Sequence, residues 1–154
     1  MGSQIVNGIN YAVLAKQILT TGKDSENVVI LIFNEKTGSS EPILVNIERV
    51  LEGNSGFGGT KVDVKTELDK DLQEIWDKAF EIWIGARVTP FAFLGTQVTK
   101  GTNYIFAAIY TATMYPDDII KVVIVTINPL ENRVTFADML ESKYEASLGY
   151  AFSW

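Results

Sequence analysis

The chain has 154 residues, a formal net charge of −6, and neither cysteine nor histidine. Disulfides, thiolate metal sites and mechanisms that use a thiol or an imidazole are therefore excluded. Carboxylates, lysine and tyrosine remain for catalysis, but nothing places Glu48 and Asp138 in one cleft and Asp117-Asp118 has no evident third ligand, so we expect no catalytic residues, no metal and no other cofactor. Nucleic acids and anionic membranes attract clustered basic residues, and the acidic balance argues against both as partners.

The N-terminal segment carries a motif that returns near the middle of the chain. The first copy consists of Gln4, Ile5, Val6, Asn7 and Gly8, followed by Ile9, Asn10 and Tyr11. The second consists of Gln97, Val98, Thr99, Lys100 and Gly101, followed by Thr102, Asn103 and Tyr104. The glutamine, glycine, asparagine and tyrosine are identical in both copies. This internal repeat predicts two units of common ancestry.

Each motif is followed by three segments rich in β-branched and aromatic residues. After the first motif they cover residues 10–19, 28–34 and 43–51, with polar turns at 20–27 and 35–40. After the second they cover residues 103–114, 119–128 and 133–140, with turns at 115–118 and 128–132. Strands separated by short polar turns predict two antiparallel β-meanders.

Residues 53–65 lie between the two meanders and are expected to form a glycine-rich linker. The spacing of glycines over 53–60 is similar to that of a phosphate-binding loop. Such a loop requires lysine directly after its last spaced glycine, where this chain has Gly59. A flexible connection between the units is therefore the better interpretation.

A helix is expected directly after the linker. Thr66 and Asp69 can act as a cap pair at its start, and Gly85 is a natural stop. Apolar side chains recur at three- and four-residue spacing between these limits, at Leu68, Leu72, Ile75, Trp76, Ala79, Phe80 and Trp83. This stripe should pack on a sheet, and residues 88–98 then predict a strand that leads into the second motif.

The C-terminal tail, residues 142–154, resembles the segment that precedes the second motif. Residues 143–149 are similar to 78–85, and residues 150–154 alternate like 90–94. We expect the tail either to complete the first unit with a short helix and a strand or to form an ordinary cap. Completion can occur within one molecule or in a strand-exchanged homodimer. The oligomer contacts expected in the latter case are Tyr150, Phe152 and Trp154.

Residues 4–8 followed by Asn10-Tyr11 resemble the cystatin family. In those inhibitors a Gln-x-Val-x-Gly hairpin inserts into the active-site cleft of papain-like cysteine proteases. The resemblance implies a curved antiparallel sheet gripping one long helix, and it gives Gly58-Gly59 the place of the inhibitors' N-terminal glycine segment. It covers residues 56–140 as an arrangement and 4–51 in part. Thr99 replaces the motif's valine in the second copy, and Leu130 stands where many cystatins have tryptophan.

The sequence thus predicts an α+β, cystatin-like fold with two pseudo-repeated β-meander units in a single compact body, residues 1–154. The first unit is expected over 1–52, and the helix with the second unit over 66–141. The function expected is that of a non-catalytic protein-binding or assembly module, with the binding residues in 4–8 and 97–101 and the protein partner left open.

Three alternatives to this function follow from the same residues. One is a cystatin-type inhibitor of papain-like cysteine proteases. Another is a small-molecule carrier or enzyme, which requires a pocket with convergent polar groups between helix and sheet. In the third, the motif is purely structural, with its glycine required by a tight hairpin. No leader or membrane-spanning segment is expected, which leaves cytoplasm and secretion after trimming both open.

Overall fold

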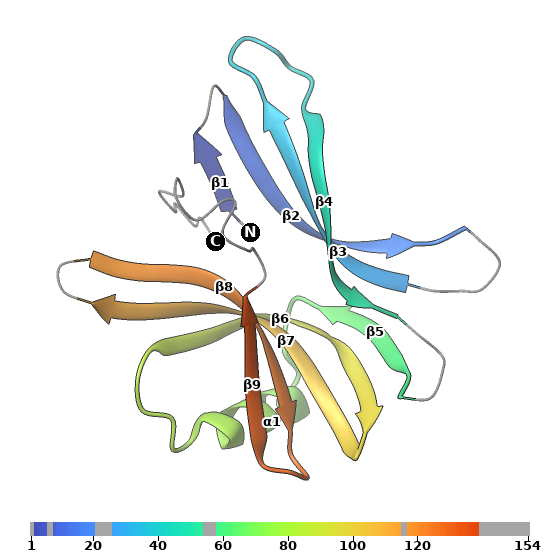
Figure 1. Cartoon of the computed structure of the whole chain (residues 1–154), viewed down its shortest axis with the longest axis vertical. Coiled ribbons are helices and arrows are strands. Elements are labelled where there is room, and N and C mark those ends of the chain that lie inside the picture. Colours follow the sequence, from blue (N-terminus) through green and yellow to red (C-terminus); the bar gives the residue numbers. More distant parts are fainter. Residues whose placement is uncertain (1, 6–7, 21–25, 54–57, 115–116, 139–154) are drawn as a thin grey trace. The chain divides into compact units, whose positions relative to one another are not determined.

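The computed structural model describes residues 2–5, 8–20, 26–53, 58–114 and 117–138. The described residues form an α+β fold with two antiparallel sheets and one helix (Figure 1). The chain divides into two compact units, one containing residues 1–52 and the other residues 53–140. The expected tail over 142–154, with Tyr150, Phe152 and Trp154, lies outside the described residues, as do Val6 and Asn7.

The first unit is a four-stranded sheet, called sheet 1 below. Its strands are β1 (Gly2–Ile5), β2 (Ile9–Ile18), β3 (Glu26–Glu35) and β4 (Ile43–Glu52), hydrogen-bonded in that order. The central strand β3 carries the most apolar run, and Val28, Val29 and Ile30 are almost wholly buried. A strand buried on both faces selects consecutive β-branched residues rather than an alternating pattern, which is why this run predicts a strand well.

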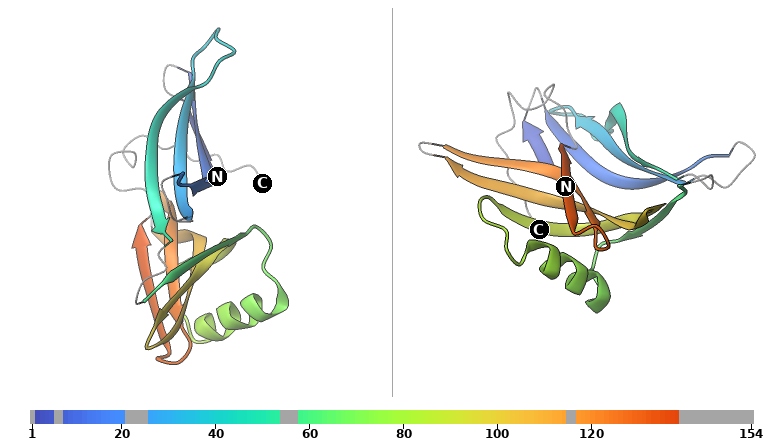
Figure 2. Two further views of the ribbon diagram at one scale, coloured as in Figure 1. Left: turned by 90° about the vertical axis from the view of Figure 1, so that its right-hand side faces the viewer. Right: turned by 60° about the horizontal axis from the view of Figure 1, so that its bottom comes forward.

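The second unit is a five-stranded sheet, called sheet 2, with one helix. Its elements are β5 (Thr60–Lys65), α1 (Lys70–Phe80), β6 (Arg87–Thr99), β7 (Gly101–Met114), β8 (Asp117–Asn128) and β9 (Arg133–Asp138). The strands follow one another across the sheet in sequence order, and every pair is antiparallel. Figure 2 shows α1 lying against one face of this curved sheet.

The helix is held to sheet 2 by an aromatic core. Leu72 and Trp76 are the buried residues of α1. The rings of Trp76 and Phe106 pack edge to face with their centroids 5.2 Å apart. The ring of Phe93 packs on Phe106 in the same way, at 5.3 Å. Burying each such side chain contributes about 1.5–3 kcal/mol, so this contact fixes the helix on the sheet.

The sequence prediction was wrong about part of the linker. Thr60–Lys65 forms β5, which pairs with β6 through Thr60–Gln97 and Val62–Gly95. The buried Val62 alternates with exposed Lys61 and Asp63, as expected for an edge strand with one apolar face. The glycine-rich stretch directly before it obscured this short alternation.

The helix is also shorter at both ends than the apolar stripe suggests. Its N-cap is Asp69, whose carboxylate accepts a hydrogen bond from the Leu72 N–H at 3.1 Å. The helix ends at Phe80, and the Trp83 N–H donates to the Phe80 carbonyl instead of continuing the α-helical pattern. The Trp83 indole donates to the Ala86 carbonyl at 2.7 Å, so this residue belongs to the loop before β6.

The other predicted strands agree with the structure to within a few residues at their described ends. No helix among the described residues is long and apolar enough to cross a lipid bilayer.

Candidate functional site

The second motif forms the tight hairpin between β6 and β7. Thr99 pairs with Gly101 at its tip, and Gln97 lies opposite Asn103. The Asn103 amide donates to the Gln97 side-chain oxygen, and the Thr99 hydroxyl donates to Asn103 Oδ1, each at 3.4 Å. Gly101 has a φ of 99°, a conformation that favours glycine. Three of the four residues that are identical in both copies, Gln97, Gly101 and Asn103, thus take part in this hairpin.

Asn128 ties this hairpin to the next one, between β8 and β9. Its Nδ2 donates to Asn103 Oδ1 at 2.9 Å and to the Lys100 carbonyl at 3.3 Å. Its Oδ1 accepts from the backbone N–H groups of Leu130 and Glu131, both at 3.1 Å. Both N–H groups and the oxygen of this buried amide are therefore occupied inside the protein, and the two turns are held at a fixed distance.

A third segment reaches the same end of sheet 2. The Val98 N–H donates to the Gly59 carbonyl at 3.1 Å, which places the Gly58-Gly59 segment beside the motif hairpin. We call the three segments together the hairpin edge. It consists of Gly58-Gly59 and of residues 97–101 and 129–132.

The hairpin edge presents apolar side chains to solvent. Val98 is 59% exposed and Leu130 is 73% exposed, and they come from the two different turns. Thr99 and Lys100 are also exposed at the tip of the first turn. Preorganised turns with apolar tips can enter a groove on another protein at a low cost in conformational entropy.

The first motif has a related arrangement in sheet 1. Gln4 lies opposite Asn10 in the register of β1 and β2, and Asn10 lies opposite Asn34 in the register of β2 and β3. The Asn34 amide donates to Asn10 Oδ1 at 2.7 Å. Gly8 has a φ of 126°, and a Cβ at this position would collide with the Glu35 carbonyl oxygen. The glycine is thus required where the first hairpin approaches the turn after β3.

The sequence prediction missed Asn34 and Asn128. Each is an asparagine near the end of a β-branched strand, directly before a turn. That position is a recognisable signal for a turn-capping side chain. Its partner in the motif could not be identified because the pairing depends on the register of two strands.

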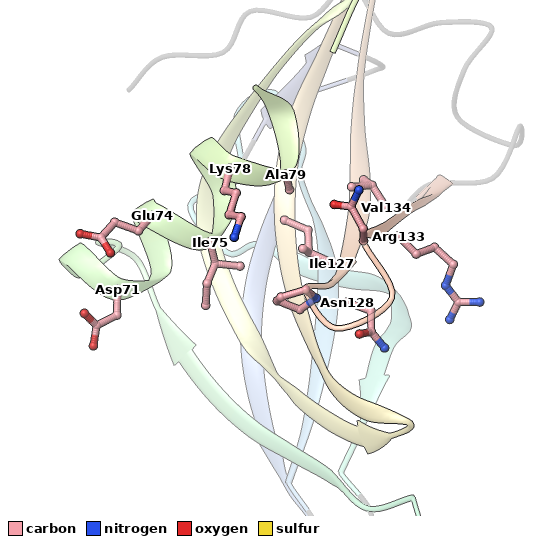
Figure 3. A pocket seen from close by; sticks show the side chains of 11 residues that line it. Asp71, Glu74, Ile75, Lys78, Ala79, Ile127, Asn128, Arg133 and Val134 are labelled. Atoms are coloured by element: carbon pink, nitrogen blue, oxygen red, sulfur yellow. The ribbon is translucent and has the colours of Figure 1, made fainter. Parts of the chain in front are cut away.

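A cavity of about 370 Å³ lies between α1 and the β8–β9 turn. Its lining is mixed and consists of Asp71, Glu74, Ile75, Lys78, Ala79, Ile127, Asn128, Pro129, Asn132, Arg133 and Val134. Figure 3 shows the Lys78 side chain extending from α1 toward the sheet, while those of Asp71 and Glu74 extend away from it. The Arg133 side chain extends away from the helix. Asn128 is already fully hydrogen-bonded within the protein. Two of the charged lining residues are paired as well, Glu74 with Lys70 and Arg133 with Glu131.

Among the described residues, no three acidic side chains lie close enough to hold a metal ion. Comparison with family models gives no match, and neither curated proteins nor solved structures match the chain significantly.

Proposed function

We propose that the protein is a non-catalytic, cystatin-like binding module that recognises a protein partner through the hairpin edge. The order of elements in the second unit supports the cystatin-like assignment. The helix lies between the first and second strands, and all five strands follow in sequence order across the sheet. The cystatin resemblance implies the same succession of helix, strand, motif turn and strand.

The asparagine pairs support the proposal that the two units are pseudo-repeats. Asn10 corresponds in position to Asn103, and Asn34 corresponds to Asn128. In each unit the second asparagine donates one amide hydrogen bond to the first, across neighbouring strands. The motif glycine of each copy approaches the turn that follows the second asparagine. Common ancestry of the two units predicts such a shared arrangement of neighbouring turns.

One observation carries the proposed binding site: three segments distant in sequence meet at one end of sheet 2 and are joined by hydrogen bonds. Gly59 is bonded to Val98, and Asn128 is bonded to both turns. The exposed Val98 and Leu130 therefore lie on a preorganised surface, where burying both would contribute several kcal/mol to association.

A second candidate function is inhibition of papain-like cysteine proteases. The position of Gly58-Gly59 beside Val98 favours it, because cystatins bind proteases through a glycine segment together with two hairpins. Thr99 and Leu130 depart from the pattern of the inhibitors, so we expect binding weaker than that of a typical member.

The inhibitor function is tested by titrating papain with the purified chain. We expect micromolar inhibition that weakens at least tenfold in Val98→Asp. The matched control is Ile82→Asp, at an exposed isoleucine outside the hairpin edge. Full protease activity at micromolar chain would end the inhibitor proposal.

The broader binding function is tested with proteins isolated by affinity to the wild-type chain. A partner that uses the hairpin edge should lose binding to the double variant Val98→Asp, Leu130→Asp and keep binding to Ile82→Asp. Partners that bind all three chains equally would place the binding site elsewhere and overturn the proposal.

A further inference from the structure

Sheet 1 has an apolar face that no helix among the described residues covers. The side chains on this face lie on β2 and β4 and share exposures between 37% and 48%; they are Ile9, Tyr11, Val13, Leu44 and Ile47. The register confirms that they share a face, because Tyr11 and Leu44 both lie opposite Phe33, and Val13 and Ile47 both lie opposite Leu31. A large exposed apolar face usually marks a site of contact.

This face corresponds to the face of sheet 2 that α1 covers. Tyr11 and Tyr104 each follow the motif asparagine of their copy. Tyr104 packs against the core cluster that contains Leu72 and Trp76 of α1. In the described part of the first unit, no helix occupies the position that α1 occupies in the second unit.

Part of the edge of β2 has no strand beside it among the described residues. β1 pairs with β2 only as far as Gly2–Ala12, so among the described residues Val13–Ile18 has no strand on that side. In sheet 2, β6 continues to pair with β7 as far as Arg87–Thr111. Sheet 1 thus lacks, in the described residues, a helix followed by a strand segment that leads into β1.

Residues 139–154 contain a sequence suited to both missing parts. Leu140, Tyr144 and Leu148 recur at four-residue spacing, which predicts one apolar helical face, and Gly149 is a natural stop. Tyr150-Ala151-Phe152 then matches Phe91-Ala92-Phe93 of β6. About ten helical residues span roughly 15 Å, and five extended residues span roughly 16 Å, so the segment has enough length for both elements.

We propose that the C-terminal segment, residues 139–154, docks on this face of sheet 1. Its helical part covers Tyr11, Val13 and Ile47, and its last five residues extend the line of β1 along β2. This proposal is independent of the hairpin edge, which lies in the second unit.

The absence of native cysteine allows a direct test by thiol labelling. A chain carrying Val13→Cys has a single thiol on the proposed docking face. Adding Tyr144→Asp and Leu148→Asp should raise its labelling rate at least tenfold, because a charged helical face cannot pack on apolar side chains. The matched control, Ser142→Asp with Ala146→Asp, adds the same charge on the opposite helical face and should leave the rate unchanged.

A second reporter separates loss of docking from general unfolding. Ala108 is buried under α1, so a thiol in Ala108→Cys should stay protected in both pairs of variants. Equal labelling of the Val13→Cys thiol in all three backgrounds would overturn the proposal.

The solution mass of the chain then identifies whether the docked segment comes from the same molecule or from a second copy. A monomer docks its own C-terminus, and a dimer that dissociates only in the Tyr144, Leu148 variant exchanges this segment between two copies.

Discussion

Asn128 and Asn103 lie side by side on neighbouring strands, and the amide of the first donates to the carbonyl oxygen of the second at 2.9 Å. Asn34 and Asn10 repeat this contact in the other sheet at 2.7 Å. In both sheets the pair lies next to the motif hairpin. A polar pair at this place links the motif to the following turn, and the first predictions concern this link.

Replacing Asn128 by alanine should lower the free energy of unfolding by about 2–3 kcal/mol. The change leaves the Lys100 carbonyl and the N–H groups of Leu130 and Glu131 without their partner. Urea denaturation measures the effect. The control is Gln73→Ala on the exposed face of α1, where we expect less than about 0.5 kcal/mol. Equal losses in both variants would contradict the role assigned to Asn128.

Alanine substitutions at three turn glycines should differ in cost according to their surroundings. Gly38 has a φ of 85° with open space around it, so Gly38→Ala should cost only about 1–2 kcal/mol for the backbone conformation. At Gly101 the new Cβ would also press on the Leu130 side chain at 3.0 Å. At Gly8 it would collide with the Glu35 backbone, so Gly8→Ala should be the most destabilising, at about 3 kcal/mol or more.

Thermal or urea unfolding of the three alanine variants gives this order directly. A Gly8→Ala variant as stable as Gly38→Ala would show that the first hairpin does not need close approach to the turn after β3.

Two tryptophans should contribute very differently to stability. Trp76 is 4% exposed and contacts Phe106, so Trp76→Ala should cost about 3–5 kcal/mol through the cavity it leaves. Trp83 is 41% exposed and lies beyond the end of α1, and Trp83→Ala should cost clearly less. Chemical denaturation monitored by circular dichroism compares the two. A larger loss for Trp83 would contradict the difference in burial between the two side chains.

The start of α1 should weaken in acid. Hydrogen bonds from Lys65 and from the Leu72 N–H hold the pKa of the Asp69 carboxyl below its usual range. Because the folded-state pKa is lowered, this contribution is present above the ordinary value near 3.9 and is lost as the pH falls through the lower folded value. Asp69→Asn keeps a capping oxygen without the charge, so its stability should vary less with pH in this range. Identical acid profiles of variant and wild type would contradict the assignment.

Tyr11 should titrate above the ordinary value of a phenol. Its hydroxyl donates to the Glu35 carboxylate at 3.0 Å, and this bond raises the pKa of the phenol. The stabilisation is therefore complete below the ordinary value near 10 and is lost as the pH rises through the folded value. Comparing ultraviolet titrations of wild type, Tyr11→Phe and Glu35→Gln isolates this group. Glu35→Gln should lower its pKa toward the ordinary value.

The sequence predicts strands well where burial and intrinsic preference select the same residues. Val28, Val29 and Ile30 form a β-branched run because β3 is central in its sheet and buried on both faces. The short edge strand β5 was missed, since only Val62 is buried in it and glycines precede it. The helix end was placed too late because Trp83 continues the apolar spacing although its N–H already bonds to Phe80.

The candidate site was only half predictable for a related reason. The repeated motif could be identified by comparing the chain with itself, since its residues are consecutive. Asn34 and Asn128 act through partners more than twenty positions away in the chain, and such pairing is set by strand register. The contact of Gly59 with Val98 likewise depends on β5, which the sequence did not indicate.

The Asn128 amide makes all of its hydrogen bonds within the protein. The groups that hold the hairpin edge together therefore differ from the side chains that this edge presents to a partner. Buried amides join the turns. Val98, Lys100 and Leu130 take part in this network through backbone groups alone, and their side chains are exposed. These outer positions can therefore vary widely without unfolding the turns. A randomised library at the outer positions should yield mostly folded proteins with new binding preferences, which would make this end of the sheet a natural scaffold for engineered recognition.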